Sequence, residues 1–403
     1  MKQGWDLKKI GEIGTVFNGN SINAKVKKEK YTNLEEGLPY IATKDISYES
    51  VIDYGNGIKI PDEDKSSFKI ASQNTILICA EGGSAGRKIG FTDQEVCFGN
   101  KLFALSTTDK VNSRFVYYYY FSPQFQEDFA SQLTGIIGGV SMAKFKKLKV
   151  PLPSPPEQQR IVQILEKAFV AIDKAKQNAE QNLSNTRELF KSYLNEIFEN
   201  SNNTWQERPL NELCVKERII TYGVIKLGDN TINGVPCLRT SNVRWLNIDI
   251  SGIKLIEQQL SSEYSRTILK GAEVLVNVRG TLGGVAVVSD NMVGWNVSRE
   301  VAVVPIDKDI VDPFFISFFI GSDLSQMWFN SVKKGAAYVG INIEDLRRLP
   351  IYFPKIDAQR IIVERIKDVQ RKYYNALNIY ERKIANLQEL KKSILQKAFE
   401  GEL

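Results

Sequence analysis

The chain has 403 residues, of which 43% are hydrophobic and 25% charged, a composition typical of a folded globular protein with room for two domains. It contains no histidine, which excludes Ser-His and Cys-His nucleophile pairs, HExxH zinc sites and the usual proton shuttle near neutral pH. The formal net charge of +6 is compatible with nucleic-acid binding but does not require it.

The start of the chain and its cysteines indicate the compartment. No apolar run approaches the roughly 18 residues that a membrane span needs, and the start "MKQGWDLKKIGEIG" lacks the apolar core of a signal peptide. We therefore expect a cytoplasmic protein with no membrane contact. The cysteines have no CxxC spacing and are expected to be core thiols, with no metal site and no disulfide framework: Cys79, Cys97, Cys214 and Cys237.

The first half begins with β-rich runs. Three of them, 37–46, 74–80 and 97–107, are separated by turns at Gly and Asn. An aromatic helical stretch follows at 112–133, and we interpret its run "YYYY" as core packing in preference to base stacking. A glycine-containing loop ("TGIIGGV") and a basic segment then lead to a strand bounded by prolines.

A long helix is predicted after these prolines. From 157 to 200, apolar residues recur mostly in steps of three and four, with charged residues between them and no internal Pro or Gly. The second half ends in the same way, with a heptad-like seam from 357 to 400 and a stop signal at Gly401. Each helix of about 44 residues would be roughly 66 Å long. Neither can bury its apolar stripe alone, so we expect the two helices to pack antiparallel.

The chain as a whole is an internal repeat. The segment "WDLKKIGEI" at 5–13 matches "WQERPLNEL" at 205–213, and "LPYIATKDI" at 38–46 matches "VPCLRTSNV" at 235–243. At an offset of 198, residues 75–91 match 273–289, and "NKLFALS" from Asn100 matches "SREVAVV" from Ser298. Identities are few while the pattern of apolar and polar positions persists. The halves are therefore expected to share one fold and to differ in surface.

The predicted fold class is α+β: two similar globular α/β-mixed domains separated by two long antiparallel coiled-coil helices, in a pseudo-twofold internal repeat. The predicted boundaries are 1–152 and 201–353 for the globular domains, 153–200 for the central helix and 354–403 for the C-terminal helix. A domain of about 150 residues is near 38 Å wide. Two such domains on a rod would be spaced by about one turn of B-DNA, roughly 34 to 36 Å. Because the domains differ, their natural target would be an asymmetric, interrupted DNA sequence.

These features resemble the specificity subunits of Type I restriction-modification systems. The resemblance covers essentially the whole chain and is most specific in the boundary segments at 154–162 and 354–363 and in the ending "SILQKAFEGEL". It implies that each globular domain is a target recognition domain for one half of a bipartite double-stranded DNA site. The helices would set the spacer and dock two methyltransferase subunits, and restriction-translocase subunits would join the complex.

The resemblance also implies a non-catalytic chain without a cofactor, with S-adenosylmethionine bound by the adenine methyltransferase partner. The sequence agrees, since it contains no [DN]-P-P-[FY] motif and no strand-linked GxGxxG. The segment "PDEDK" at 61–65 is interpreted as a solvated turn and not as a metal site. The isolated subunit could form a homodimer through uncovered helix faces. Four residues at the matching junctions are expected to attach the helices to the domains: Gln159, Arg160, Gln359 and Arg360.

Candidate DNA-binding residues lie where strands give way to loops, at equivalent places in both halves. Arg or Lys suits guanine, Asn or Gln suits adenine, and acids suit cytosine. The candidates in the first half are Thr43, Lys44, Asp45, Arg87, Lys88, Asn100, Lys101, Lys144 and Lys146. Those in the second half are Arg239, Thr240, Ser241, Asn242, Arg244, Arg279, Thr281, Arg299, Lys333 and Lys334. For any one of them a solvated surface side chain is the simpler interpretation. The group as a whole is favoured because the same loop positions carry polar or basic residues in both halves, while the residue types differ, as recognition of two different half-sites requires.

Other functions remain open. A specificity subunit of a Type II system, in which one partner both cleaves and methylates, would have a similar architecture. A non-DNA scaffold with two binding domains on a coiled-coil rod would lack the steep salt dependence of DNA binding. A self-contained enzyme is disfavoured by the missing histidine and the missing cofactor motifs.

Overall fold

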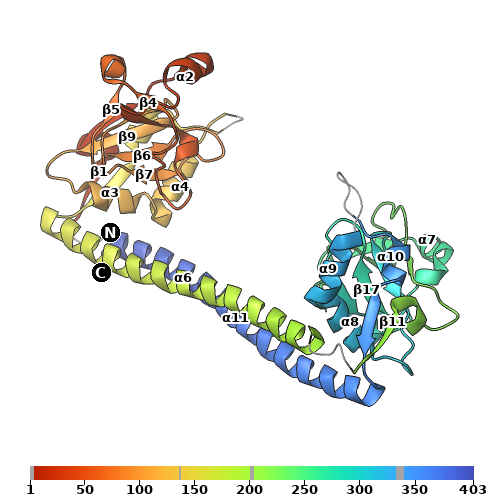
Figure 1. Ribbon diagram of the computed structural model, residues 1–403. Coiled ribbons are helices and arrows are strands. Elements are labelled where there is room, and N and C mark those ends of the chain that lie inside the picture. Colours follow the sequence, from red (N-terminus) through yellow and green to blue (C-terminus); the bar gives the residue numbers. More distant parts are fainter. Residues whose placement is uncertain (1–3, 136–137, 200–203, 333–339) are drawn as a thin grey trace. The chain divides into compact units, whose positions relative to one another are not determined.

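The structure is a computed structural model that describes residues 4–135, 138–199, 204–332 and 340–403. Contacts divide the chain into two compact units: unit 1 comprises residues 1–180 and 382–403, and unit 2 comprises residues 181–381. Each unit therefore combines a β-rich part with one portion of each long helix (Figure 1).

Unit 1 contains two four-stranded sheets. The first is antiparallel and has the order β2 (Gly14–Asn18), β9 (Leu102–Thr107), β6 (Ile76–Cys79), β7 (Ile89–Phe91). The second has the order β4 (Lys59–Ile60), β3 (Leu38–Ile41), β8 (Val96–Phe98), β5 (Ile70–Ala71), and its central strands β3 and β8 are parallel. Every residue of β6 is buried, as in a strand that is covered on both faces.

Short helices and one further strand pair complete unit 1. Strand β1 (Asp6–Lys9) pairs with β10 (Lys149–Leu152), the strand that leads into the first long helix. The helices are α1 (Ile10–Ile13), α2 (Ala24–Lys30), η1 (Thr43–Asp45), η2 (Asp62–Ser67), α3 (Ser113–Tyr119), α4 (Pro123–Ser131) and α5 (Met142–Lys147). The predicted aromatic stretch forms both α3 and α4, because the hydroxyl of Ser122 caps α4 and Pro123 occupies its first turn. Tyr119 and Tyr120 are buried in the core, as predicted.

Unit 2 repeats this plan. Strand β11 (Gln206–Pro209) pairs with β21 (Pro350–Phe353), and a four-stranded sheet has the order β12 (Thr221–Tyr222), β20 (Val301–Val304), β17 (Val274–Asn277), β18 (Val285–Val287). The smaller sheet has the order β16 (Lys254–Ile256), β13 (Val235–Leu238), β19 (Asn296–Val297), and β14 (Val243–Arg244) forms a hairpin with β15 (Asn247–Ile248). The helices are η3 (Leu210–Leu213), α7 (Gln258–Glu263), η4 (Ser265–Thr267), η5 (Asp290–Met292), α8 (Pro313–Gly321), α9 (Asp323–Val332) and α10 (Ile343–Arg347).

The shared topology confirms the predicted internal repeat. The parallel pair β3 and β8 of unit 1 recurs as β13 and β19 of unit 2. A close backbone approach recurs as well: a Cβ at Gly19 would lie 1.9 Å from the carbonyl oxygen of Phe98, and a Cβ at Gly223 would lie 1.9 Å from that of Val297. Glycine is therefore required at the same place in both units.

The sheet register corrects the predicted match of the strands β9 and β20. Leu102 lies opposite Cys79, and Val301 lies opposite Asn277, so Leu102 corresponds to Val301. The predicted alignment is wrong here by one residue. Successive side chains of a strand point to opposite faces, so such a shift exchanges inward and outward positions.

The loops after β6 and β17 also differ in length. Ile89 lies opposite Ile78, and Val285 lies opposite Val276. The connection therefore spans 80–88 in unit 1 and only 278–284 in unit 2. The constant offset predicted for this segment is wrong beyond the loop, because a surface loop accepts a length change at little cost.

The two long helices are α6 (Pro155–Glu199) and α11 (Ile356–Glu400), each of 45 residues, close to the predicted ranges. Helix α11 ends where Gly401 adopts a φ of 81°, the left-handed conformation that commonly stops helices. Among the described residues, no helix is long and apolar enough to cross a membrane.

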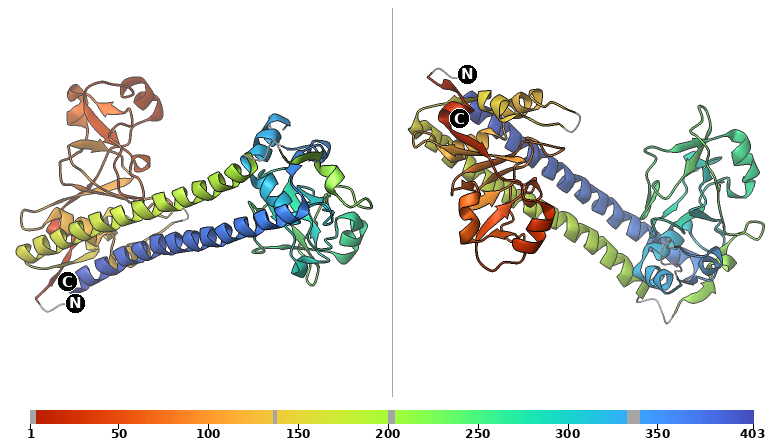
Figure 2. Two further views of the ribbon diagram at one scale, coloured as in Figure 1. Left: turned by 60° about the horizontal axis from the view of Figure 1, so that its bottom comes forward. Right: turned by 90° about the horizontal axis from the view of Figure 1, so that it is seen from above.

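In unit 1 the two helices are antiparallel, as predicted. Arg160 near the start of α6 donates to the carbonyl oxygen of Leu403 at 2.6 Å, and Asp173 further along α6 pairs with Lys391 at 3.0 Å. The two views of Figure 2 show the end of α11 beside the first part of α6. In unit 2 the opposite portions of the helices meet through Phe190 of α6, whose ring stacks on that of Tyr373 at 4.6 Å.

The end of one long helix completes the core of each unit. Phe399 of α11 packs edge-on against Phe115 of α3, with ring centroids 5.2 Å apart. Phe198 of α6 packs edge-on against Phe315 of α8 at 5.5 Å. Because these rings are buried, each helix end is part of a folded core and not a detachable connector.

Candidate nucleic-acid interface

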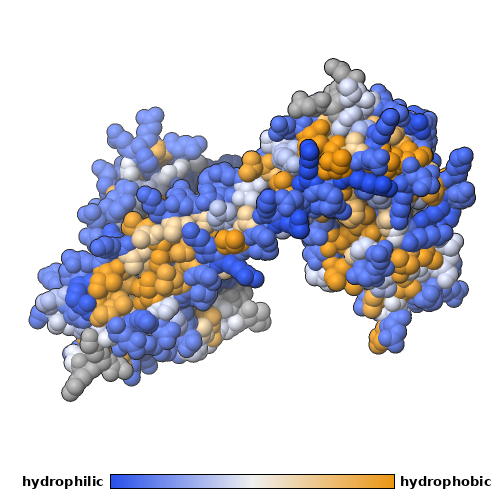
Figure 3. Space-filling view, turned by 90° about the horizontal axis from the view of Figure 1, so that it is seen from below, coloured by the Kyte–Doolittle hydropathy of each residue, from blue (hydrophilic) through white to orange (hydrophobic). Residues whose placement is uncertain are grey.

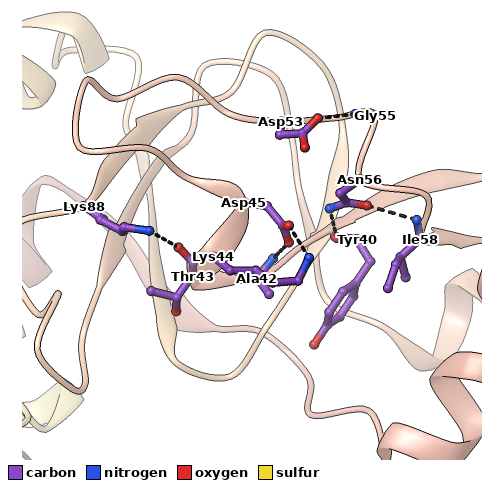
Figure 4. Close-up of polar contacts among 10 residues, drawn as sticks. All are labelled: Tyr40, Ala42, Thr43, Lys44, Asp45, Asp53, Gly55, Asn56, Ile58 and Lys88. Carbon is purple, nitrogen blue, oxygen red and sulfur yellow. Dashed lines mark hydrogen bonds and ion pairs between the residues drawn. The ribbon is translucent and has the colours of Figure 1, made fainter. Parts of the chain in front are cut away.

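Most of the predicted residues of unit 1 meet at one edge. Strands β3 and β6 end there and β9 begins there, so their loops lie side by side. The Ala80 N–H donates to the carbonyl oxygen of Lys101 at 2.9 Å, and Lys88 Nζ donates to the carbonyl oxygen of Thr43 at 3.1 Å (Figure 4). We call the residues 42–48, 80–88, 99–101 and 138–140 the loop edge of unit 1.

An exposed tyrosine organises two cations of this edge. The ring of Tyr48, whose exposed fraction is 52%, lies 5.0 Å from the guanidinium carbon of Arg87 and 5.2 Å from Lys88 Nζ. Its hydroxyl lies 3.3 Å from that of Ser84. Cation–π contacts of this kind hold long basic side chains in place without neutralising their charge. Arg87 and Lys88 are therefore positioned together at the surface.

Two of the predicted residues are turn caps. The carboxylate of Asp45, 6% exposed, accepts the Ala42 N–H at 2.8 Å and pairs with Lys44 (Figure 4). In unit 2 the side-chain oxygen of Asn242, 1% exposed, accepts the Arg239 N–H at 3.0 Å. Both side chains close the turn that follows β3 or β13. To reach a base, either would have to give up these bonds.

Unit 2 forms the equivalent edge. The Nδ2 group of Asn277 donates to the carbonyl oxygens of Val243 at 3.0 Å and Thr281 at 3.1 Å, which ties the loop after β13 to the loop after β17. The Val278 N–H donates to the carbonyl oxygen of Glu300 at 2.8 Å. We call the residues 239–246, 278–284, 298–300 and 340–342 the loop edge of unit 2.

A cavity of about 610 Å³ adjoins the loop edge of unit 2. Thr240, Arg244 and Thr281 line it together with Trp245. Arg187 and Lys191 of α6 line it from the side of the long helix. Three predicted residues from two separate loops thus line one depression.

The remaining candidates vary in exposure. Asn100, Lys101, Ser241 and Thr281 are exposed. Arg239 is partly buried and donates to the carbonyl oxygen of Gly252 at 2.9 Å. Arg299 forms an ion pair with its neighbour Glu300 at 3.2 Å.

Some candidates lie elsewhere. Lys144 is in α5, where the Ser141 hydroxyl caps its N–H at 3.3 Å. The Cβ of Lys146 would lie only 3.2 Å from a Cβ at Gly11, so this lysine sits beside α1 and away from the loop edge. Lys333 and Lys334 lie outside the described residues.

The interpretation of the sequence missed several residues that the structure places at these edges. Glu81, Tyr48 and Trp245 were not selected, and neither was Asn277, which joins two loops of unit 2. A signal for Glu81 was present, because the repeat aligns it with the selected Arg279.

The described residues offer no metal centre, since no three Cys, Asp or Glu side chains among them lie close enough to hold an ion. The segment "PDEDK" forms η2, where the Tyr31 hydroxyl donates to Asp64 at 3.0 Å. The four cysteines are free and buried. Burial raises the pKa of the Cys97 thiol to about 11 and those of Cys214 and Cys237 to about 12, so these thiols are protonated and unreactive at neutral pH.

Two units of one fold, each presenting a polar loop edge with its own side chains, define a two-domain recognition protein. The model of the family described as "Type I restriction modification DNA specificity domain" matches residues 2–181 and again residues 202–386. The chain belongs to this family and carries its domain twice, which confirms the resemblance found in the sequence.

Curated relatives span nearly the same length. The chain is 23% identical to the Type I restriction enzyme EcoBI specificity subunit of Escherichia coli, over 99% of this chain and 86% of that protein. It is 23% identical to the MjaVIII specificity subunit of Methanocaldococcus jannaschii, over 99% and 93%. It is also 23% identical to the EcoKI specificity subunit of Escherichia coli, over 100% and 90%.

Solved structures share the fold. A chain from the work titled "Structural basis underlying complex assembly and conformational transition of the type I R-M system" matches with a TM-score of 0.78 and 17% identity, covering 100% of this chain and 99% of that one. The HsdS subunit from Thermoanaerobacter tengcongensis matches with a TM-score of 0.56 and 17% identity, covering 100% and 98%. At this level of identity the likeness concerns the fold alone.

Proposed function

We propose that unit 1 and unit 2 each recognise one half of a bipartite, asymmetric double-stranded DNA target. The observation that supports this proposal is the recurrence of the loop edge, with the same backbone connections and different side chains in the two units. Base-specific contacts require side chains on a rigid scaffold at the surface. Buried strands such as β6 and β17 provide that scaffold beneath both edges.

The basic and amide side chains of the edges suit duplex DNA. Arg87 and Lys88 in unit 1, and Arg244 in unit 2, offer donors for phosphate oxygens or for guanine. Because the whole chain has a net charge of only +6, we expect tight DNA binding to need the partner subunits.

We further propose that α6 and α11 dock two methyltransferase subunits and set the spacer between the half-sites. Apolar side chains on these helices are exposed: Val170, Leu189, Ile361, Ile379 and Leu390. Figure 3 shows hydrophobic patches among hydrophilic surface on one face of the molecule. A partner subunit that packs against the helices would bury these side chains. Without a partner, the same side chains would favour homodimers of the isolated subunit.

In this assembly the chain itself performs no chemistry. The methyltransferase subunits would bind S-adenosylmethionine and methylate adenine, and restriction-translocase subunits would join the complex for cleavage. The buried, protonated thiols described above are consistent with a purely binding role.

The test is a map of methylated adenines. The chain would be co-expressed with the methyltransferase encoded beside it, and the host DNA would be sequenced for modified bases. We expect one interrupted, asymmetric motif that disappears when this chain is omitted. Methylation that is unchanged without the chain, or absent although the methyltransferase is active with another specificity subunit, would contradict the proposal. DNA binding by the assembled complex should also weaken steeply with salt, whereas a non-DNA scaffold would show no such dependence.

A further inference from the structure

The two loop edges place charged residues of opposite sign at one equivalent position. Glu81 follows the buried end of β6, and Arg279 follows the buried end of β17. The backbone shows that the positions are the same, because Glu81 forms a β-bridge with Gly139 and Arg279 forms one with Gly340. In each unit the next residue is a glycine in the left-handed conformation. The two side chains therefore leave their loops from matching backbone geometry.

A second pair of equivalent positions lies beside the first and also carries charged residues of opposite sign, with the basic residue in unit 1 and the acidic residue in unit 2. The Ala80 N–H donates to the carbonyl oxygen of Lys101, and the Val278 N–H donates to the carbonyl oxygen of Glu300. Lys101 and Glu300 are thus equivalent. Unit 1 has acid then base where unit 2 has base then acid, a pattern that the corrected sheet register reveals.

These charges are not needed to build the fold. In unit 1 the residues before Glu81 are buried, whereas Glu81 is exposed and its carboxylate has no partner among the described residues. Arg279 is partly exposed, and its guanidinium carbon lies 5.7 Å from the ring centroid of Tyr222. A contact with a ring face leaves the in-plane N–H donors of arginine available. Both side chains can therefore bond to a ligand at the edge without loss of a hydrogen bond to any residue that the structure describes.

The chemistry of the two groups suits different bases. Arginine donates two parallel hydrogen bonds to O6 and N7 of guanine, whereas a carboxylate accepts from the N4 amino group of cytosine. A carboxylate also repels phosphate, so an exposed acid on a DNA-binding edge disfavours contact with the DNA backbone. It is tolerated where it faces hydrogen-bond donors of the bases.

We propose that Glu81 and Arg279 are specificity-determining residues, Glu81 selecting a cytosine in the half-site of unit 1 and Arg279 selecting a guanine in the half-site of unit 2. This inference rests on the proposed function and deepens it. The same position of one fold thus selects cytosine in one half-site and guanine in the other.

The test uses the complete methyltransferase complex and the methylation map of single variants. For Arg279→Gln, we expect the preference for guanine at one base pair of one half-site to fall at least about tenfold, while the other half-site is unchanged. For Glu81→Gln, we expect the same loss for cytosine in the other half-site. Glu81→Arg should go further and replace the preference for cytosine at that position by a preference for guanine on the same strand, a result that a structural role cannot produce.

Matched controls lie at the opposite ends of the strands. Glu95 is exposed in the turn before β8, and Arg266 is exposed in η4 before β17, so Glu95→Gln and Arg266→Gln should leave both half-sites unchanged. Complex assembly would be checked by size-exclusion chromatography. Half-sites that stay unchanged in both test variants would overturn the inference. An equal loss of methylation at all sites by a correctly assembled complex would also overturn it, since such a loss indicates contact with the DNA backbone. If the unmodified chain directs methylation to no bipartite motif, the proposed function itself fails, which is a different outcome.

Discussion

The side-chain oxygen of Gln158 accepts the backbone N–H of Asn112 at 2.8 Å, and the amide nitrogen of the same side chain donates to the carbonyl oxygen of Pro153 at 2.8 Å. Unit 2 repeats this arrangement: Gln359 accepts from the Asp312 N–H at 2.9 Å and donates to the carbonyl oxygen of Pro354 at 2.8 Å. Both glutamines are buried at the start of a long helix, and Asn112 and Asp312 cap the aromatic helices α3 and α8. One glutamine therefore attaches each long helix to its globular part.

The first prediction concerns this attachment. Gln158→Leu removes both hydrogen bonds and leaves a buried N–H and C=O unpaired, so we expect a loss of about 2 to 4 kcal/mol in the free energy of unfolding. Gln159→Leu is the matched control. Gln159 is exposed, and within the described part of the chain its side chain bonds only that of Asn112, at 2.8 Å, so its loss should cost less than about 1 kcal/mol. Urea unfolding of the full chain measures both, and equal costs would show that the buried glutamine is not the attachment point.

The second prediction uses two adjacent tyrosines. The hydroxyl of Tyr120 is buried and has no hydrogen-bond partner among the described residues, whereas that of Tyr119 donates to the carbonyl oxygen of Lys149 at 3.1 Å. Tyr120→Phe removes an unpaired polar group and should raise the free energy of unfolding by about 1 kcal/mol. Tyr119→Phe should lower it by about 1 kcal/mol. Thermal unfolding would detect the opposite signs, and a destabilised Tyr120→Phe would mean that this hydroxyl is bonded in solution.

The third prediction separates turn caps from base contacts. Asp45→Ala and Asn242→Ala should each destabilise the fold by about 1 to 2 kcal/mol, because each leaves a backbone N–H of its turn without an acceptor. Asp45→Asn keeps an acceptor and should cost less. The methylation motif should stay the same in all three variants. A changed half-site in an otherwise stable variant would show that these side chains leave the turn to contact DNA.

The fourth prediction concerns alkaline pH. Burial raises the pKa of the Cys97 thiol to about 11 and that of Cys237 to about 12, against an ordinary value of 9.0. Because the folded state favours the neutral thiol, this contribution to stability is fully present below pH 9 and is lost as the pH rises toward 11 or 12. The free energy of unfolding should therefore fall above pH 9.

Alkylation gives a direct check of the same thiols. In the native protein all four cysteines should react slowly with iodoacetamide near neutral pH, and in urea they should react at the rate of free thiols. Mass spectrometry would locate the modified residues. Rapid modification of Cys97 in the folded chain would contradict its burial.

The local pattern of the sequence predicted most of the architecture. Heptad spacing without Pro or Gly predicted α6 and α11 to within two residues, because a 45-residue helix is decided by periodic apolar positions along its own length. The alternation of apolar and polar positions predicted the shared fold of the two units, since buried strands keep their hydrophobic pattern when surfaces diverge. The same pattern indicated where the strands end, and therefore which loops carry the candidate DNA-binding residues.

The register of the repeat and the roles of single loop residues were decided only by tertiary structure. A sequence comparison cannot place a length change within a loop, so it matched Lys101 with Arg299, whereas the hydrogen bonds of β6 and β17 match Lys101 with Glu300. Asp45 resembled a DNA ligand by residue type, but its oxygens are used by its own turn. The sequence by itself determined which segments fold and that they recur. The folded chain decided which polar side chains are consumed by the scaffold and which, such as Glu81, are left at its surface, because that depends on backbone groups distant in the sequence.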